Sequence, residues 1–142
     1  MGTRGKLPGR WVYGGIFPGT GDFFIIYDWE AEQEQTGCNI KSGRSISNTI
    51  GQYTGLPDKN GVKIFEGDIV RTHYANAKKE DIVDYIVFNN GRFCATPDDE
   101  HCWIDLADGV RHPPQDRSVY MEWYEVIGNI YDNPELLEEA QP

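Results

Sequence analysis

The chain has 142 residues, 39% of them hydrophobic and 13% aromatic, and its thirteen Lys and Arg against twenty-three Asp and Glu give a formal net charge of −10. This composition predicts a single folded domain over residues 1–142 and excludes intrinsic disorder. The negative charge repels a phosphate backbone, which disfavours nucleic acid as a partner. No segment approaches the roughly 20 apolar residues that a transmembrane helix needs, so we expect no membrane association.

The cysteines bear on the compartment. Cys38, Cys94 and Cys102 are odd in number, and no apolar stretch that would serve as a signal peptide follows the opening "MGTRGKLPGR". These features predict reduced thiols and a cytoplasmic protein.

The amino-terminal part predicts two strands. "RWVYGGIF" and "GDFFIIYDW" are rich in aromatic and β-branched residues and are flanked by the turn formers Gly-Gly and "PGTG". The following residues, 30–47, read "EAEQEQTGCNIKSGRSIS" and are polar, which predicts a loop excursion.

The central stretch "QYTGLPDKNGVKIFEGDIV" at first suggests a calcium loop starting at Asp58. An EF-hand loop needs glycine at position six and a bidentate Glu at position twelve. Here Gly61 stands at position four and Ile69 at position twelve, so the register fails.

Turn chemistry explains the same stretch better. Asn60-Gly61 and Gly67-Asp68 are turn-forming pairs, and we expect Asp58 and Asp68 to bond nearby backbone amides. The glycines at positions 55, 61 and 67 are then present for their φ freedom.

The carboxy-terminal half predicts more strands. "DIVRTHY", "DIVDYIVFN", "RFCA" and "EWYEVIGNIY" are strand-like, and Asn90-Gly91 suits a type I′ turn in a hairpin from about Val83 to Ala95. Residues 97–118 form a second predicted loop excursion, with one short element around Trp103 to Leu106. "DNPELLEEA" predicts a short helix capped by Asn133.

Searches for catalytic or metal chemistry give only minority alternatives. Cys94, His101 and Cys102 are zinc or enzyme candidates, but there is no C-x-x-C pair, and adjacent residues do not readily turn toward one tetrahedral ion. No nucleophile elbow accompanies Cys94 or Ser118. We therefore expect no catalytic residue, no metal and no cofactor. Three histidines are possible partners of Cys94 or Ser118, and four carboxylates are possible acids or bases: His73, His101, His112, Asp98, Asp99, Glu100 and Asp105.

Aromatic residues on or beside the predicted strands are a further lead, since exposed rings stack bases or anchor peptides. They are Trp11, Tyr13, Tyr27, Trp29, Tyr53 and Tyr124. A nucleic-acid-binding β barrel that uses Arg71 and His73, flanked by Lys78 and Lys79, is the alternative that they support.

The sequence resembles the YopX family, small proteins encoded by bacteriophages and prophages. The resemblance rests on the block from Gln52 to Val70 and on the closing "VIGNIYDNPELL", with support from "RGK" and "GRWVYGG" near the start and from "SNTIGQ". Family members commonly have more residues before the Arg-Gly-Lys, whereas only Met1 to Thr3 precede it here, so we expect a first strand built on such residues to be shortened or missing.

The resemblance and the residue patterns together predict a mainly β fold: a small barrel-like antiparallel sheet, SH3-like in part, with polar loops and a short carboxy-terminal helix. An α+β fold is the alternative. The resemblance implies a phage or prophage origin and no established activity. We therefore expect a non-enzymatic accessory protein in the host cytosol that binds a host or phage macromolecule. A homo-oligomer is compatible with exposed sheet edges.

Overall fold

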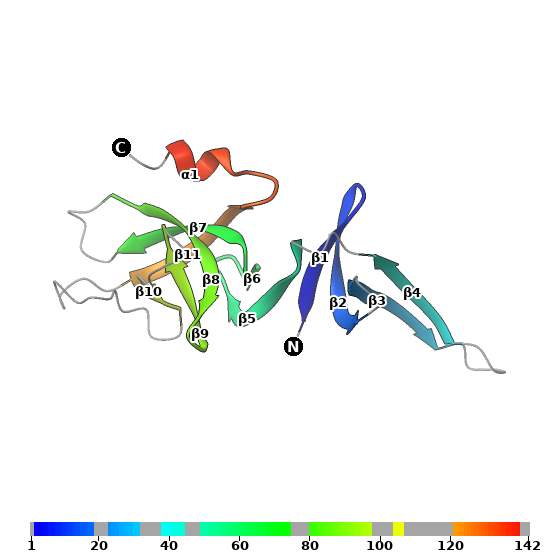
Figure 1. Ribbon diagram of the computed structural model, residues 1–142. Coiled ribbons are helices and arrows are strands. Elements are labelled where there is room, and N and C mark those ends of the chain that lie inside the picture. The colour runs from blue at the N-terminus through cyan, green and yellow to red at the C-terminus, as the bar shows by residue number, and fades with distance from the viewer. Residues whose placement is uncertain are drawn as a thin grey trace. The chain divides into compact units, whose positions relative to one another are not determined.

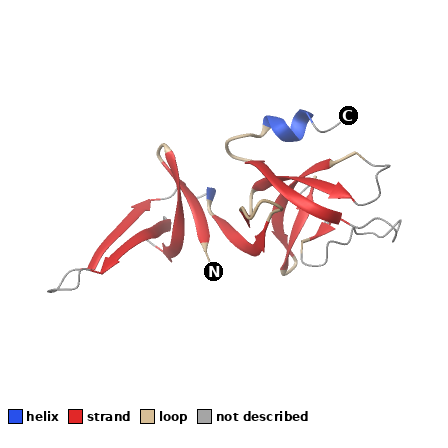
Figure 2. Cartoon of the chain, turned by 180° about the vertical axis from the view of Figure 1, so that it is seen from behind, coloured by secondary structure: helices blue, strands red, loops and turns tan. Residues whose placement is uncertain are grey.

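A computed structural model describes residues 2–18, 23–31, 38–44, 49–74, 80–97, 104–106 and 121–139. The chain divides into two compact units, Met1–Tyr53 and Thr54–Pro142, where the sequence analysis expected one domain. Each unit is described by itself. Strands, red in Figure 2, dominate both units. The described part contains one α-helix, α1 (Glu135–Glu139), which is short. The predicted mainly β class is confirmed.

The first unit is an antiparallel sheet in the order β4-β3-β2-β1-β5 (Figure 1). Its strands are β1 (Thr3–Leu7), β2 (Arg10–Pro18), β3 (Phe23–Ala31), β4 (Cys38–Arg44) and the start of β5 (Gly51–Pro57). β1 and β2 pair from Thr3↔Gly14 to Leu7↔Arg10, which leaves a tight turn in which Gly9 has a φ of 81°. The first strand is therefore present, and the two strands predicted here correspond to β2 and β3.

The prediction of a loop over residues 30–47 is wrong for residues 30–31, which end β3, and for residues 38–44. β4 occupies Cys38–Arg44 and pairs with β3 from Phe24↔Arg44 to Ala31↔Cys38. Polar composition favoured a loop, but strand preference depends on the pairing partner, and the ladder to the apolar strand β3 supplies one. Residues 32–37 and 45–48 lie outside the described part.

The second unit is built on a five-stranded antiparallel sheet in the order β10-β9-β8-β7-β11, which forms half a barrel (Figure 1). The strands are β7 (Asp68–Tyr74), β8 (Ile82–Asn89), β9 (Arg92–Thr96), β10 (Ile104–Asp105) and β11 (Met121–Asn129). β6 (Lys63–Phe65) follows the end of β5, and the Thr54 hydroxyl donates to the Ile64 carbonyl at 2.9 Å. The expected barrel-like sheet is thus confirmed as a half-barrel.

The core of the second unit lies on one face of this sheet. Its buried residues are Ile64, Val70, Tyr74, Ile86, Ala95, Leu106 and Tyr124, with Ile82, Phe93 and Val126 packed against them. In β7 the apolar residues Ile69 and Val70 and the small Thr72 are all buried, so this strand is covered on both faces over most of its length.

The hairpin prediction is confirmed. β8 and β9 pair through Asn89↔Arg92, and the two residues between them, Asn90 and Gly91, have φ values of 50° and 82°. Two consecutive positive φ values are the requirement of a type I′ turn. The short element expected around Trp103 to Leu106 corresponds to β10; other residues of the predicted 97–118 excursion, except Pro97, lie outside the described part.

The central stretch forms two turns, as predicted. Asp58 and Val62 close the first, where the Asp58 amide donates to the Val62 carbonyl at 2.7 Å. In the second, Asp68 Oδ2 accepts the Phe65 amide at 2.8 Å. All three glycines of the stretch, at positions 55, 61 and 67, have positive φ.

The short helix α1 (Glu135–Glu139) follows β11, but its predicted side-chain cap is wrong. Asn133 Oδ1 accepts the Asn129 amide at 3.4 Å, and its backbone carbonyl accepts the Leu136 amide at 3.1 Å. The Asn133 side chain closes the turn after β11 and not the helix, because Asn129 lies directly beside it across that turn.

Candidate functional site

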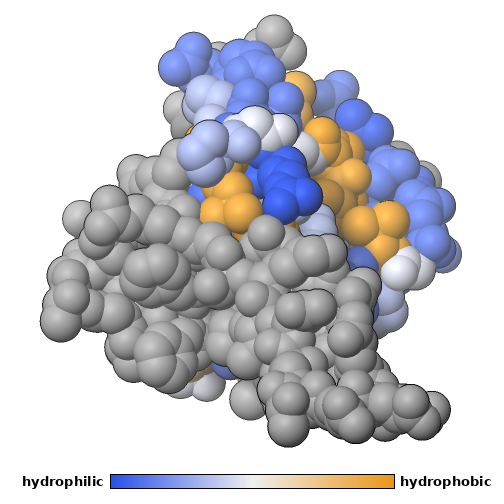
Figure 3. Space-filling model, turned by 90° about the vertical axis from the view of Figure 1, so that its right-hand side faces the viewer, coloured by the Kyte–Doolittle hydropathy of each residue, from blue (hydrophilic) through white to orange (hydrophobic). Residues whose placement is uncertain are grey.

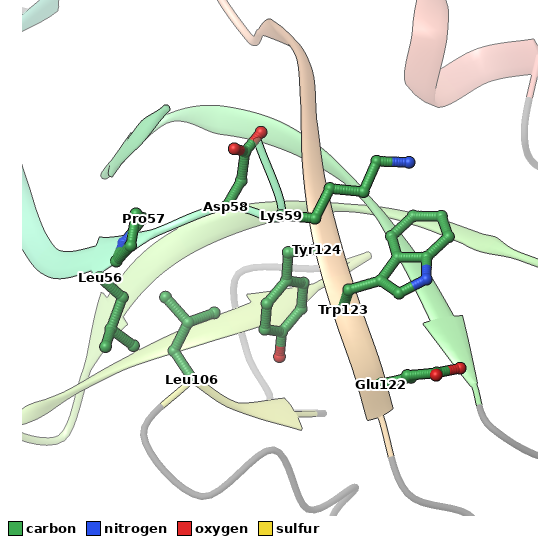
Figure 4. Close-up of a pocket in the computed structure, with 8 residues that line it drawn as sticks. All are labelled: Leu56, Pro57, Asp58, Lys59, Leu106, Glu122, Trp123 and Tyr124. Carbon is green, nitrogen blue, oxygen red and sulfur yellow. The ribbon is translucent and has the colours of Figure 1, made fainter. Parts of the chain in front are cut away.

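A pocket of about 320 Å³ lies within the second unit. Three segments that are distant in the sequence line it: Leu56–Lys59 at the end of β5, Leu106 after β10, and Glu122–Tyr124 in β11 (Figure 4). β10 and β11 are the two edge strands of the five-stranded sheet. The pocket therefore lies where the half-barrel remains open.

The pocket has an apolar part and a charged part. In Figure 4, Leu56 and Leu106 lie on one side of the Tyr124 ring, and Lys59, Trp123 and Glu122 lie on the other. Leu106 and Tyr124 are only 4% and 6% exposed and form the floor, whereas Leu56 is 38% exposed at the rim. Such a combination of apolar floor and few charged groups is typical of binding sites.

A β-bulge shapes the β11 side of the pocket. The register of β11 against β7 shifts between Met121↔Tyr74 and Trp123↔His73, which makes Glu122 the extra residue. In a regular strand, successive side chains point to opposite faces, and a bulge redirects a side chain locally. Here three consecutive residues, Glu122, Trp123 and Tyr124, all line the same pocket.

Asp58 lines the pocket but its carboxylate is committed to the backbone. Oδ1 accepts the amides of Asn60 at 2.8 Å and Val62 at 2.9 Å, and Oδ2 accepts the amide of Val126 at 3.0 Å. Burial acts to raise the pKa of this carboxyl, but the three amides and the Lys59 ammonium outweigh it and hold the pKa below its usual range. Asp58 is thus a structural anion, as the turn interpretation predicted.

Trp123 is the centre of a group of polar side chains beside the pocket. The Lys59 ammonium lies 3.7 Å from the centroid of the Trp123 ring, and the His73 ring stacks on Trp123 with centroids 4.7 Å apart and planes inclined by 11°. Lys59 Nζ is also 3.3 Å from Glu125 Oε2. These contacts hold the indole in place at the pocket wall.

The basic residues of the nucleic-acid alternative face carboxylates. Arg71 Nη1 lies 3.3 Å from Glu125 Oε2, and His73 Nδ1 lies 2.7 Å from Asp81 Oδ1. His73 Nε2 is 3.6 Å from Glu122 Oε2. A phosphate approaching Arg71 or His73 therefore meets negative charge, while Lys78 and Lys79 lie outside the described residues.

The zinc candidates are not brought together in the described part. Cys94 is disulfide-bonded, so the prediction of a reduced thiol at this position is wrong. A sulfur in a disulfide is also not the thiolate that zinc binds. His101 and Cys102 lie outside the described residues. Among the residues that the structure describes, no group of three His, Cys, Asp or Glu side chains could hold a metal ion.

The aromatic residues singled out in the sequence differ in their exposure. Tyr124 is core and forms the pocket floor, Tyr13 is 56% exposed, and Trp11 and Tyr53 are half-buried. Trp11 lies 4.8 Å below the Arg4 guanidinium. The side chains of Tyr27 and Trp29 lie outside the described part. In the part of the surface that Figure 3 colours by hydropathy, hydrophobic residues (orange) lie beside hydrophilic ones (blue).

Sequence reasoning missed most of the pocket. Leu106, Glu122 and Trp123 carry no local motif and lie more than 40 residues from Leu56 and Lys59, whose block was interpreted as turns. The only usable signal was the density of polar residues around Asp58, which indicated turns.

No helix in the described part of the chain has the length and apolar character needed to span a membrane.

Comparison with known proteins gives one family and one solved structure to report. The family model described as "YopX protein" matches residues 25–138. The crystal structure of protein EF1440 from Enterococcus faecalis is 31% identical, with 80% of this chain and 78% of that chain covered and a TM-score of 0.48. No curated protein matches. The family match extends over most of the chain and includes both sequence blocks, and the chain belongs to the YopX family.

Proposed function

We propose that this chain is a non-enzymatic accessory protein of a bacteriophage or prophage that binds a protein of the host or phage in the bacterial cytosol. The observation that carries the proposal is the pocket at the open side of the half-barrel, with its floor of Leu106 and Tyr124 and its wall of Trp123. Partly exposed tryptophan beside an apolar pocket is the usual chemistry of an interface hot spot.

The lining of the pocket supports binding in preference to catalysis. Among its described lining residues there is no Ser, Thr, Cys or His to act as nucleophile or base. Asp58, one of the two carboxylates of the lining, is only 7% exposed and already accepts three amide hydrogen bonds. A group held in this way is poorly suited to proton transfer.

The test is a quantitative pull-down from bacterial lysate with two matched variants. Leu56→Glu places a charge on the pocket rim, whereas Val62→Glu places the same charge on an exposed apolar residue that does not line the pocket. We expect Leu56→Glu to reduce recovery of the partner by about tenfold or more, as for an interface hot spot, and Val62→Glu to leave it unchanged. No partner above background at any salt concentration, or equal loss in both variants, would refute the proposal.

A nucleic-acid-binding role has less support, because Arg71 faces the Glu125 carboxylate, and the His73 ring faces those of Asp81 and Glu122. It predicts DNA or RNA binding that weakens steeply as salt rises. Absence of binding at low salt would remove it.

A further inference from the structure

The net charge of the chain is confined to the second unit. Residues 54–142 contain eight Lys and Arg against eighteen Asp and Glu, whereas residues 1–53 contain five of each. The second unit therefore carries the whole formal charge of −10. A field of one sign around a binding surface attracts partners of the opposite sign.

The charged residues that line the pocket are also mostly acidic. Lys59, the cation of the lining, is 3.3 Å from Glu125, and Arg71 shares the same carboxylate oxygen at the same distance. Glu122 has its side chain 56% exposed, and its Oε2 atom lies 3.6 Å from His73 Nε2. Glu122 is therefore the charged group on the rim that is most accessible to a ligand cation.

The apolar half of the pocket fits a single side chain. The whole pocket has a volume of about 320 Å³, at the lower end for a site that encloses a small molecule, near 300 Å³. Leu56, Leu106 and Tyr124 supply apolar contacts on the side away from Glu122. An aliphatic or aromatic side chain would be buried there while a neighbouring residue of the same ligand reaches the charged side.

We propose that the pocket binds a basic peptide segment of a partner protein, in which an apolar side chain enters between Leu56, Leu106 and Tyr124 while a neighbouring Lys or Arg pairs with Glu122. This inference rests on the proposed function and names the chemistry of its partner. Glu122 and Tyr124 are two residues apart in β11 and line the same pocket, which brings the charged and the apolar features together.

Other occupants fit this site less well. A nucleic acid would bring phosphates to an acidic unit, and a second copy of the chain that docked through its own second unit would bring eighteen acidic and eight basic residues. Both contacts are opposed by like charge. A cationic and partly apolar peptide is attracted by the negative field, pairs with Glu122 and covers the apolar floor.

The experiment is a selection from a random peptide library displayed on a surface, with the full chain as bait. We expect enriched peptides to combine an apolar residue with neighbouring Lys or Arg and to be depleted of Asp and Glu. Individual peptides are then measured by fluorescence anisotropy. Leu56→Glu should abolish binding, and Glu122→Lys should weaken it by roughly fivefold, the effect of about 1 kcal/mol from a rim ion pair.

The matched control is Glu138→Lys, the same charge change at an exposed residue of α1 that does not line the pocket. It should leave the affinity for the peptide within twofold. Repeating the selection on Glu122→Lys should shift the preference from Lys or Arg toward Asp or Glu. This change of preference is a readout that a merely destabilised variant would not give.

The outcomes separate this inference from the proposed function. Enrichment of acidic or uncharged peptides, no enrichment at all, or equal losses in Glu122→Lys and Glu138→Lys would overturn the basic-peptide inference. In each case, loss of the lysate partner in Leu56→Glu but not in Val62→Glu would still support the proposed function. If that partner is retained by Leu56→Glu, the proposed function itself fails.

Discussion

Asp58 and Val126 are 68 residues apart in the sequence, yet Asp58 Oδ2 accepts the Val126 amide at 3.0 Å. Next to this bond, the Lys59 amide donates to the Tyr124 carbonyl at 2.9 Å. Together the two bonds connect the turn after β5 to β11, which is an edge strand of the sheet. The turn thus provides partners for backbone groups of β11 that a further strand would otherwise pair with. The same two segments form opposite parts of the pocket, and its shape depends on this connection.

Asp58→Asn should destabilise the second unit. An amide replaces one carboxylate oxygen, so one of the three backbone donors loses its acceptor or faces an NH₂ group. Hydrogen bonds to a charged group are worth about 1.5–3 kcal/mol each, and we expect a loss of ~2–4 kcal/mol in the free energy of unfolding in urea. Glu80→Gln, at an exposed site, is the control and should change stability by less than about 0.5 kcal/mol. Equal stability of Asp58→Asn and the native chain would contradict the role of this carboxylate.

The contribution of Asp58 should depend on pH in a defined direction. Its pKa lies below the ordinary value of 3.8, because hydrogen bonds and Lys59 outweigh the burial that acts to raise it. A lowered pKa in the folded state means that the stabilisation is complete above the unfolded pKa and is lost as the pH falls through the folded one. The stability difference between the native chain and Asp58→Asn should thus be constant from neutral pH to about pH 5 and shrink below pH 4. Urea titrations at a series of pH values measure it, and a difference that grows on acidification would contradict the sign.

Gly67→Ala should be destabilising for two separate reasons. Gly67 has a φ of 86°, and a Cβ built there would lie 3.0 Å from Tyr131 Cε2. The backbone cannot readily move away, since its amide donates to the Ile86 carbonyl and its carbonyl accepts the Ile130 amide. We expect a loss of about 1–3 kcal/mol in unfolding free energy.

Gly2→Ala is the matched control for this substitution. Its φ is not in the left-handed region, and a Cβ at that position meets nothing within 4 Å. Thermal unfolding followed by circular dichroism should therefore show a lower midpoint for Gly67→Ala only. A midpoint shift of the same size in both variants would mean that the effect is not local to the turn.

Features fixed by neighbouring residues could be predicted from the sequence. The Asn90-Gly91 hairpin, the bonds of Asp58 and Asp68 to nearby amides and the final strand depend on local dihedral preferences and short-range hydrogen bonds. These are the levels at which sequence patterns are informative.

Features that depend on pairing between distant segments could not be predicted. β4 is polar and becomes a strand through its ladder with β3, and the bond from Val126 to Asp58 joins two blocks that showed no sign of contact in the sequence. Leu56, Leu106 and Trp123 come together in the pocket only in the folded half-barrel. No pattern of residue types marks the bulge at Glu122. Register and bulges are set by tertiary packing, which a single sequence does not display.

Lys59→Met should test how firmly Trp123 is held at the pocket wall. The substitution keeps most of the aliphatic stem and removes the ammonium, which lies 3.7 Å from the Trp123 ring centroid and 3.3 Å from Glu125 Oε2. Both contacts are partly exposed, so we expect a loss of only about 0.5–1 kcal/mol in unfolding free energy. A double-mutant cycle with Trp123→Leu should give a coupling energy of similar size.

Arg71→Met is the variant that separates the two contacts of Lys59. Arg71 pairs with the same Glu125 oxygen at 3.3 Å, so its removal reports on the loss of an ion pair to that carboxylate. The cycle between Arg71→Met and Trp123→Leu should show coupling well below that of Lys59→Met, because the cation–π contact is made by Lys59. Equal coupling in the two cycles would mean that Trp123 responds to the charge around Glu125 and not to the ammonium above its ring.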